Sequence, residues 1–322
     1  MAMNEFDLIQ LFFNQEKINR PDVMQGIGDD AALLQVPTGQ QLVVTTDTLV
    51  ANKHFPENTS PGDIGYKALA VNLSDLAAMG AKPAWILLAL TLPTADKNWL
   101  EAFTKDFFSL IHRFNCQLVG GDLTKGPLSI TVQALGFVPV GKALRRCGAQ
   151  VGDQIIVTGT LGDAGLALNY LQKKIPFSFT KNEIKQFMTR FNRPEPHVSV
   201  GLALRDIATS AIDISDGFVA DLGHILAASQ MSAKIDVSKI PLSDSLKKLP
   251  TKEAYSLALN AGDDYELCFT VPKFREHKLQ DVLKKLDCHY TPVGCITLGN
   301  KLILENYDKT QFILEKQGFK HF

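Results

Sequence analysis

Hydrophobic residues in the first half of the chain recur with two kinds of spacing, which predict alternating strands and helices. Some segments are short, rich in Val, Ile, Leu and Thr, and flanked by turn-forming residues, as is typical of β-strands. These segments are residues 42–50, 84–92 and 128–140. The longer stretches between them have helical periodicity, so the pattern indicates an α/β domain.

The helix expected after the first strand has clear start and stop signals. Ser60-Pro61-Gly62-Asp63 combines an N-cap residue, a proline in the first turn and an acidic residue, and Gly80 supplies a stop after Met79. The intervening residues are apolar on nearly every side, which predicts a buried helix. Asn72 and Asp75 share one face of it. Further helices are expected over residues 1–14, as an amphipathic segment, and 97–114.

The pattern changes near residue 140, where a basic, loop-like segment over residues 141–146 precedes a new strand. We place a domain boundary near residue 145, which gives domains of residues 1–145 and 146–322. The second domain is expected to be α/β as well. Its helices are expected after Gly162 and over residues 195–208, and its strands over residues 153–160, 212–215, 233–237 and 265–271.

Composition limits the class of protein. A chain of 322 residues with 45% hydrophobic and 21% charged residues can bury ordinary cores, and a net charge of −1 gives no sign of a nucleic-acid or membrane surface. Glu5 and Asp7 do not suit a signal peptide, and no apolar stretch reaches membrane-spanning length. The five cysteines form no CxxC pair, which favours reduced thiols in the cytoplasm.

Aspartate recurs beside glycine or a hydroxyl residue along the whole chain. The segments are Gly28-Asp29-Asp30, Thr45-Thr46-Asp47, Asn72 to Asp75, Gly121-Asp122, Asp213 to Asp216 and Gly262-Asp263-Asp264. Carboxylates gathered in one cleft repel one another and are usually neutralised by Mg²⁺, which prefers oxygen ligands and often bridges phosphates. Asp75 is the most informative, because an unpaired carboxylate in so apolar a helix is costly. We therefore expect a magnesium site that binds phosphates.

The local settings of these aspartates differ. Thr45-Thr46-Asp47 is expected to close a strand, and Asp213 to end a strand before a helix, where α/β sheets bind ligands. Isolated Gly-Asp pairs are common in turns, and we interpret Gly152-Asp153 and Gly162-Asp163 in that way.

Other nucleotide and nucleophile motifs are not supported. Residues 26–31 match the dinucleotide fingerprint GxGxxA, but residues 20–25 before them are polar and turn-like rather than a strand. No GxxxxGK[ST] occurs, so ATP would bind through metal and backbone. His54, taken alone, is best explained as a solvated loop residue, and Ser74 and Ser215 have no histidine partner in the pattern.

Together these motifs resemble the thiamine-monophosphate kinase family, in the superfamily of aminoimidazole ribonucleotide synthetase. The resemblance runs almost end to end and is carried by GDDA at 28–31, TTDTLV at 45–50, His54-Phe55, residues 67–82 with their NLSDLAAMG core, GGD at 120–122, DISDG at 213–217 and DYEL at 264–267. It implies a two-domain α/β (α+β) fold in which the N-terminal domains of a cytoplasmic homodimer form a shared β-barrel. The N-terminal domain would bind metal and ATP, and the C-terminal α/β domain would complete the nucleotide and substrate site.

The resemblance also implies the reaction, which is in-line transfer of a phosphoryl group from ATP to thiamine monophosphate, and it implies residue roles. The catalytic residues would be Asp47, Asp75 and Asp122; the Mg²⁺ ligands Asp30, Thr45, Thr46, Asp47, Asp75, Asp122, Asp213 and Asp216; the ATP contacts Gly121, Asp122, Arg146 and Ser215; and the substrate contacts His54, Asp263 and Phe319. Since donor and acceptor are both phosphate anions, such a protein needs charge neutralisation and positioning rather than a nucleophile.

Two positions depart from the family pattern. Asp263 stands where the family usually has Glu, and Asn52 where relatives often have Gly.

Alternatives remain within and outside the superfamily. Selenophosphate synthetase would need an early reactive Cys, whereas the first here is Cys116, and the hydrogenase-maturation relative would need a C-terminal Cys. A non-catalytic sensor of divalent cations or nucleotides is the alternative of a different class.

Overall fold

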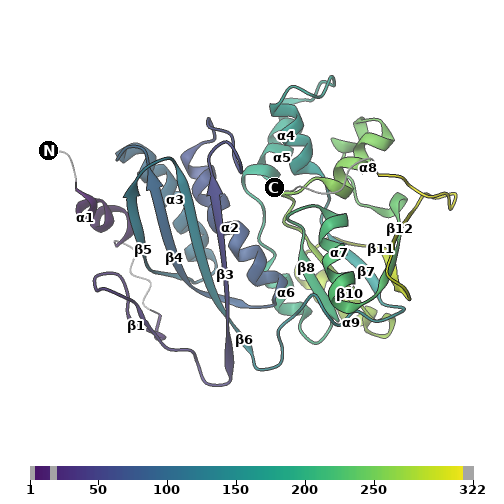
Figure 1. Ribbon diagram of the computed structural model, residues 1–322, viewed down its shortest axis with the longest axis horizontal. Coiled ribbons are helices and arrows are strands. Elements are labelled where there is room, and N and C mark those ends of the chain that lie inside the picture. Colours follow the sequence, from purple (N-terminus) through teal and green to yellow (C-terminus); the bar gives the residue numbers. More distant parts are fainter. Residues whose placement is uncertain (1–3, 15–19, 315–322) are drawn as a thin grey trace. The chain divides into compact units, whose positions relative to one another are not determined.

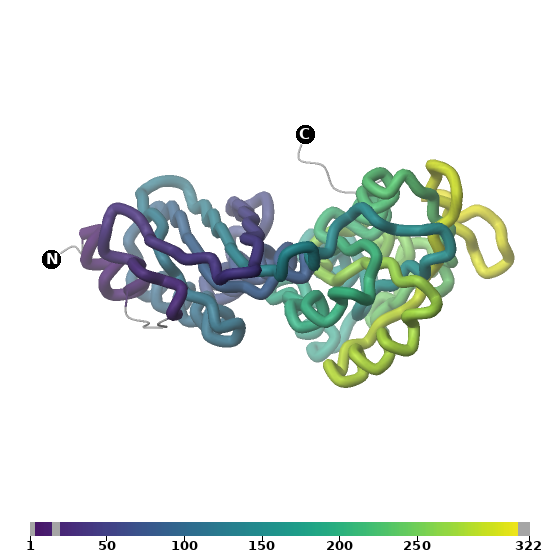
Figure 2. Tube along the Cα trace, turned by 90° about the horizontal axis from the view of Figure 1, so that it is seen from below, coloured from purple at the N-terminus to yellow at the C-terminus, as the bar shows by residue number. Residues whose placement is uncertain are grey.

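The computed structural model describes residues 4–14 and 20–314. The chain divides into two compact units (Figures 1 and 2). Unit 1 comprises Met1–Leu76 and Ala81–Gly141, and unit 2 comprises Ala77–Gly80 and Lys142–Phe322. The boundary expected near residue 145 falls just after the point where the chain enters unit 2.

The described strands of unit 1 form a mixed sheet in the order β3-β6-β4-β5. β3 (Gln40–Val50) and β6 (Ser129–Pro139) are antiparallel, as are β6 and β4 (Lys82–Leu92). These are the strands that the sequence predicts. β5 (Gln117–Lys125) pairs in parallel with β4 and was not predicted. Its central pair Gly120-Gly121 favours a loop in a sequence pattern, but the close approach of β4 requires the second of these glycines.

Two helices lie on the same face of this sheet (Figure 1). α2 (Pro61–Ala78) confirms the predicted buried helix, and the Ser60 hydroxyl accepts a hydrogen bond from Asp63 N at 3.1 Å. α3 (Lys97–Arg113) also agrees with the prediction, with Asp96 as its N-cap. A Cβ on Gly65 would lie 2.3 Å from the Phe103 carbonyl oxygen, so the two helices pack with their backbones unusually close.

The N-terminal segment contains a helical turn, α1 (Glu5–Leu8), followed by a π-helical segment, η1 (Ile9–Phe13). The short strands β1 (Val23–Gln25) and β2 (Leu33–Leu34) follow and pair with each other. The prediction that residues 20–25 form no strand was therefore wrong in part. No helix opens after Gly26, however, so the segment still lacks the geometry of a dinucleotide fingerprint.

Unit 2 is built on a second mixed sheet, of order β12-β9-β11-β7-β10-β8. Its neighbouring strands are antiparallel except for β12 and β9. The strands are β7 (Gln154–Thr158), β8 (Ser210–Asp213), β9 (Ser232–Asp236), β10 (Leu267–Val271), β11 (Tyr290–Thr297) and β12 (Leu302–Glu305). The helices are α4 (Asp163–Leu171), α5 (Lys181–Asn192), α6 (Val198–Leu204), α7 (Phe218–Ser229), α8 (Thr251–Asn260) and α9 (Glu276–Lys285), with 3₁₀ turns η2 (Val237–Lys239), η3 (Leu246–Lys248) and η4 (Lys273–Arg275).

The helices of unit 2 correct two expectations. The helix expected over residues 195–208 is only α6, because Pro194 and Pro196 precede it and Arg205 adopts an extended conformation with ψ of 136°. α5 was not predicted, although Thr180 and Glu183 form a capping box at its start.

The segment that enters unit 2 covers the free edge of its sheet. β8 is the last strand in the order, and the Ala211 N–H on this strand donates to the Arg145 carbonyl oxygen at 2.9 Å. A Cβ on Gly148 would lie 2.5 Å from the Thr209 carbonyl oxygen, so the covering segment lies close against the strand. Among the described residues, no helix is both long enough and apolar enough to cross a bilayer.

Candidate active site

Asp47 and Asp75 come together where β3 packs on α2. The Thr45 hydroxyl donates a hydrogen bond to Asp75 Oδ2 at 2.5 Å, which places α2 on the side of β3 that carries Thr45 and Asp47. Burial raises the pKa of Asp47 to about 7, and repulsion by Asp75 adds to the effect. Two carboxyl groups held in this way favour either a shared proton or a bound cation. The structure thus brings three of the predicted ligands together.

Thr45-Thr46-Asp47 lies inside β3 rather than at its end, which corrects the sequence interpretation. The pairing of β3 with β6 continues to Val50 and Ser129. Because side chains alternate along a strand, Thr46 points to the opposite face from Thr45 and Asp47. The register places Thr48 opposite Thr131, Thr131 opposite Ala89, and Ala89 opposite Asp122. Asp122 therefore shares the face of Thr46 and not that of Asp47.

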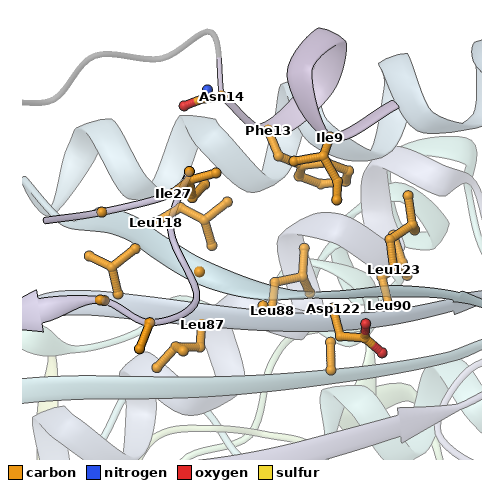
Figure 3. A pocket seen from close by; sticks show the side chains of 18 of the residues that line it. Ile9, Phe13, Asn14, Ile27, Leu87, Leu88, Leu90, Leu118, Asp122 and Leu123 are labelled. Carbon is orange, nitrogen blue, oxygen red and sulfur yellow. The ribbon is translucent and has the colours of Figure 1, made fainter. Parts of the chain in front are cut away.

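The second group of predicted residues lines a cavity of about 1350 Å³ in unit 1 (Figure 3). Asp30, Thr46, Gly121 and Asp122 contribute to its wall, together with apolar residues of the N-terminal segment and of β4 and β5. Asp29 and Asp30 lie in the exposed turn before β2, where Asp29 Oδ1 accepts from Asp30 N at 2.9 Å. The cavity is larger than typical small-molecule pockets and has carboxylates on a mainly apolar wall.

Gly121 has a structural reason to be glycine. Its φ is 155°, and a Cβ at this position would lie 1.8 Å from the Leu88 carbonyl oxygen on β4. The parallel pairing of β4 and β5 therefore excludes a side chain here. This requirement exists without any nucleotide, so the predicted ATP contact of Gly121 stays a prediction.

The carboxylates do not form a ready-made metal cage in either unit. Within residues 4–14 and 20–314, no group of three or more His, Cys, Asp and Glu residues is arranged to hold a metal ion. In unit 1 the predicted ligands instead form the two groups described above, Thr45 with Asp47 and Asp75, and Asp30 with Thr46 and Asp122.

His54 belongs to a tight turn after β3. Its Nδ1 accepts a hydrogen bond from Val50 N at 3.0 Å, so Nδ1 carries no proton in this arrangement. Asn52 in the same turn has a φ of 64°, a left-handed conformation that Gly and Asn adopt most readily. The left-handed turn thus accounts for the Asn at position 52 and would equally suit the Gly that the resemblance leads one to expect there.

In unit 2, the loops that carry Asp213 to Gly217 and Gly262 to Glu266 are hydrogen-bonded to each other. Asp263 N donates to the Ser215 carbonyl oxygen at 2.8 Å, and Tyr265 N donates to the Ile214 carbonyl oxygen at 2.8 Å. The fit is close, because a Cβ on Gly262 would lie 2.3 Å from the Ser215 oxygen. Predicted metal, nucleotide and substrate residues of this unit therefore share one backbone framework.

Asp221, in the first turns of α7, organises the loop before the helix and was missed by the sequence interpretation. Its Oδ2 accepts hydrogen bonds from the backbone N–H groups of Ser215 and Asp216 at 3.0 Å each and of Gly217 at 3.1 Å. The side chain is buried, and burial raises its pKa to about 7 despite these donors. The sequence does hold a signal for this residue, because Asp221 lies between the apolar residues Phe218 and Val219 and the apolar Leu222. As with Asp75, a carboxylate in so apolar a segment needs a partner.

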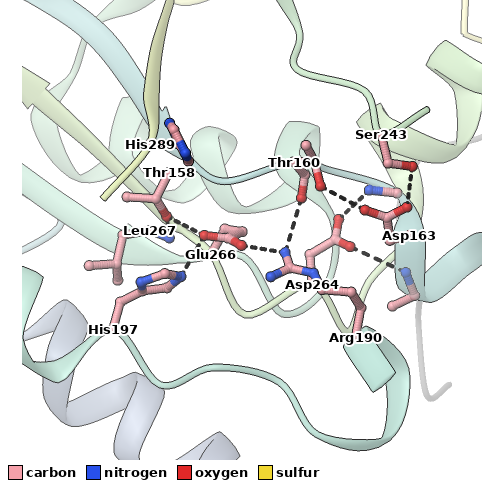
Figure 4. A network of polar contacts seen from close by, with 12 residues as sticks. Thr158, Thr160, Asp163, Arg190, His197, Ser243, Asp264, Glu266, Leu267 and His289 are labelled. Atoms are coloured by element: carbon pink, nitrogen blue, oxygen red, sulfur yellow. Dashed lines mark hydrogen bonds and ion pairs between the residues drawn. The ribbon is translucent and has the colours of Figure 1, made fainter. Parts of the chain in front are cut away.

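A second buried carboxylate, Glu266, is the centre of a polar network (Figure 4). It pairs with Arg190 of α5, lies 2.6 Å from His197 Nε2, and accepts a hydrogen bond from the Thr158 hydroxyl at 2.5 Å. Burial alone would raise the pKa of Glu266, but His197 and Arg190 outweigh it and bring the pKa to about 2. His197 and Arg190 were not among the predicted residues, because their partner is remote in sequence.

Next to this network, Asp264 fixes the start of α4. Its carboxylate accepts from Gly162 N at 2.7 Å, and burial raises its pKa well above the ordinary value. Asp163 accepts from the Thr160 and Ser243 hydroxyls, at 2.7 Å and 2.5 Å. Asp153 likewise accepts from Gln150 N at 2.9 Å. The contacts of Asp153 and Asp163 agree with their interpretation as structural residues.

The remaining predicted residues are less closely grouped. The Arg146 carbonyl oxygen accepts from the hydroxyl of Ser229, the last residue of α7, whereas Ser215 precedes the first turn of that helix. The backbones of these two predicted ATP contacts are therefore at opposite ends of a 12-residue helix, about 18 Å long. The Arg146 side chain is exposed. Phe319 lies outside the described residues.

Comparison with known proteins defines the class first. Residues 28–138 match the family "AIR synthase related protein, N-terminal domain", and residues 150–305 match "AIR synthase related protein, C-terminal domain". The two units, each with a mixed sheet and flanking helices, therefore correspond to the two domains of an AIR synthase related protein.

Within that class, the chain belongs to the thiamine-monophosphate kinase family. It is 47% identical over 323 residues to thiamine-monophosphate kinase of Escherichia coli (strain K12), covering 100% of this chain and 99% of that protein. The crystal structure of thiamine-monophosphate kinase from Stenotrophomonas maltophilia K279a superposes with a TM-score of 0.87 at 46% identity, covering 97% of this chain and 99% of that one. AaThiL complexed with AMPPCP and TMP superposes with a TM-score of 0.77 at 30% identity, covering 99% and 97%. The resemblance predicted from the sequence is confirmed.

Proposed function

We propose that this protein is an ATP-dependent kinase that phosphorylates thiamine monophosphate to thiamine diphosphate, as a step of thiamine diphosphate biosynthesis. The observation that carries the proposal is full-length identity of 47% to a thiamine-monophosphate kinase. A relative that covers almost the whole chain holds AMPPCP and TMP together, which supports one site for nucleotide and substrate. ATP is thus the co-substrate, and a non-catalytic sensor is not favoured.

The chain's own residues fit Mg²⁺. Burial, together with repulsion by Asp75, raises the pKa of Asp47 to about 7, and a divalent cation would relieve that repulsion. When bound, Mg²⁺ would neutralise phosphate charge. The proposed ligands are Asp30, Thr45, Thr46, Asp47, Asp75 and Asp122 of unit 1 and Asp213 and Asp216 of unit 2. The proposed nucleotide contacts are Gly121, Asp122, Arg146 and Ser215, and the proposed substrate contacts are His54, Asp263 and Phe319.

The protein's part in the transfer is positioning and charge control. The acceptor is a phosphate oxygen that is already deprotonated, so no general base is required. Asp47, Asp75 and Asp122 are proposed to act by holding the positive charge of Mg²⁺ beside the phosphates. The Asp263 carboxylate accepts from the Tyr265 hydroxyl at 3.2 Å, which holds the shorter side chain at this position in a defined orientation. The cytoplasm is the proposed location, on the cysteine pattern and composition.

The direct test is turnover. The protein incubated with ATP, Mg²⁺ and thiamine monophosphate is expected to form ADP and thiamine diphosphate in equal amounts, measured by chromatography. Chelation of Mg²⁺ should stop the reaction, and thiamine in place of its monophosphate is the matched control for the acceptor. Binding of ATP without formation of either product would leave only a nucleotide sensor and would contradict the proposal.

We also propose a homodimer in which the sheet of unit 1 forms a shared barrel with its counterpart. The support is the face of β3 that points away from α2, where apolar side chains are open to solvent in the single chain. Leu42, Val44 and Val50 are 41%, 51% and 37% exposed. An apolar strand face of this kind is typical of an interaction surface.

Val44→Glu is expected to shift the protein from dimer to monomer in sedimentation velocity, because a buried charge at an apolar interface is costly. Ile303→Glu is the matched control, since Ile303 on β12 is 41% exposed in the other unit. Equal sedimentation of wild type and Val44→Glu as dimers would contradict the proposed interface.

A further inference from the structure

The loop of residues 213–217 has the position of an anion site but not its chemistry. It leads into α7, a 12-residue helix, and free N–H groups at such an N-terminus attract phosphates. Here the N–H groups of Ser215, Asp216 and Gly217 all donate to one oxygen of Asp221, at 3.0 to 3.1 Å. The Asp221 side chain is 2% exposed, so the acceptor is built into the fold.

The loop is also fixed from its other side. Gly217 has a φ of 116°, and a Cβ there would lie 2.6 Å from the Asn260 carbonyl oxygen. The Ser215 carbonyl oxygen accepts from Asp263 N at 2.8 Å. Because these backbone N–H groups and a carbonyl oxygen are already used, the contribution of this loop to a ligand would come from side chains, among them the proposed metal ligands Asp213 and Asp216.

We propose that Asp221 is a positioning residue that occupies the three successive backbone N–H groups just before α7 and thereby makes loop 213–217 a cation-binding rather than a phosphate-binding loop. The inference rests on the proposed function, in which Asp213 and Asp216 hold Mg²⁺. Asp221 touches neither substrate nor metal. Its carboxylate takes up the N–H groups of Ser215, Asp216 and Gly217, so phosphates reach this loop through a cation held by Asp213 and Asp216 rather than through these N–H groups.

The test compares Asp221→Asn with Asp221→Ala. Asn retains a carbonyl oxygen that can accept the N–H groups, whereas Ala frees them. Asp221→Ala is expected to raise the Mg²⁺ concentration for half-maximal activity about tenfold or more, in the range seen when groups that orient metal ligands are removed. Asp221→Asn should stay close to wild type. The freed N–H groups should also make inorganic phosphate an inhibitor competitive with ATP in Asp221→Ala only.

A control and a second measurement separate the possible outcomes. Asp96→Ala removes another helix-capping carboxylate, which accepts from Asn98 N and Trp99 N at 2.9 and 3.2 Å, and should change neither Mg²⁺ dependence nor phosphate inhibition. Asp221→Ser, whose side chain is too short to reach the N–H groups, replaces Asp221→Ala if the latter does not fold.

Calorimetric titration with Mg²⁺ and ADP needs no turnover, so it tests the inference even if thiamine monophosphate is not the acceptor. Weaker Mg²⁺-dependent ADP binding by Asp221→Ala than by Asp221→Asn supports the inference. Equal titrations for wild type, Asp221→Asn and Asp221→Ala, with no phosphate inhibition, would overturn it. A wild type that binds Mg²⁺ and ADP normally but forms no thiamine diphosphate would overturn the proposed function alone.

Discussion

Asp47→Asn is expected to abolish turnover and, at the same time, to stabilise the ligand-free protein at alkaline pH. Turnover should fall by at least about a hundredfold, because a carboxylate proposed to hold Mg²⁺ beside the reacting phosphates is lost. The gain in stability follows from the contact with Asp75. Burial and that neighbour raise the pKa of Asp47 to about 7. An ionised Asp47 therefore destabilises the folded protein, whereas the neutral amide of Asn does not.

The pH dependence has a definite sign. A carboxyl group whose folded pKa lies above its unfolded value of 3.8 stabilises the fold while protonated, and this contribution is lost as the pH rises through about 7. The full shift would correspond to about 4 kcal/mol, and partial exposure with proton sharing reduces it to about 1–2 kcal/mol. The melting temperature of Asp47→Asn should therefore exceed that of wild type by about 3 °C at pH 8.5 and by little at pH 5.

Two variants complete this experiment. Asp75→Asn should also remove turnover while the fold survives, since it takes away the other half of the pair. Asp206→Asn is the control, because Lys142 holds the pKa of Asp206 below its usual range, so neutralising this residue should give no stability gain at alkaline pH. Near-normal kcat in Asp47→Asn, or a melting difference independent of pH, would show that Asp47 lacks the proposed role.

Glu266→Ala is expected to be the most destabilising single substitution in unit 2, at about 3–5 kcal/mol. The change leaves Arg190 and His197 without the carboxylate that neutralises them, and it removes the acceptor of the Thr158 hydroxyl. The measurement is the free energy of unfolding in urea. Asp244→Ala breaks an exposed ion pair with Lys247 and should change stability by less than about 0.5 kcal/mol.

Glu266→Gln tests the electrostatic part of the same network. Because Glu266 has a folded pKa of about 2, its contribution is present above pH 4.5 and is lost as the pH falls towards 2. Burial lowers the pKa of His197, but Glu266 outweighs this and raises it, so the His197 contribution is lost as the pH rises through that raised value. In Glu266→Gln, the free energy of unfolding should depend less on pH at both the acidic and the alkaline end of the profile. A profile parallel to that of wild type would contradict the charged pairing of Glu266 with Arg190 and His197.

The sequence predicted those features that depend on local pattern. α2 could be placed from Ser60, Pro61 and Gly80 because capping and helix termination are local. The same logic identified Asp75, since a charge in an apolar helix needs a partner wherever that partner lies. The family followed from motifs whose spacing is independent of the three-dimensional arrangement.

The features that depend on register and long-range pairing were not predicted. β5 was missed because Gly120-Gly121 favours a turn, and only the closeness of Leu88 on β4 explains the glycine at position 121. That Thr46 and Asp122 share one face while Asp47 lies on the other follows from pairing across β6 and β4. Glu266 and Arg190 are 76 positions apart, and no periodicity links them.

The segment along β8 has a consequence for the solution behaviour of the protein. β8 would otherwise present unpaired backbone groups beside buried Ala211 and Ile212, which is a template for association with other chains. The Arg145 carbonyl oxygen occupies the donor of Ala211, and Gly148 allows the close approach that this requires. The segment that enters unit 2 therefore also protects its sheet from aggregation. A cut within residues 145–148 would expose the edge strand β8 to pairing with other chains, even though both sheets remained intact.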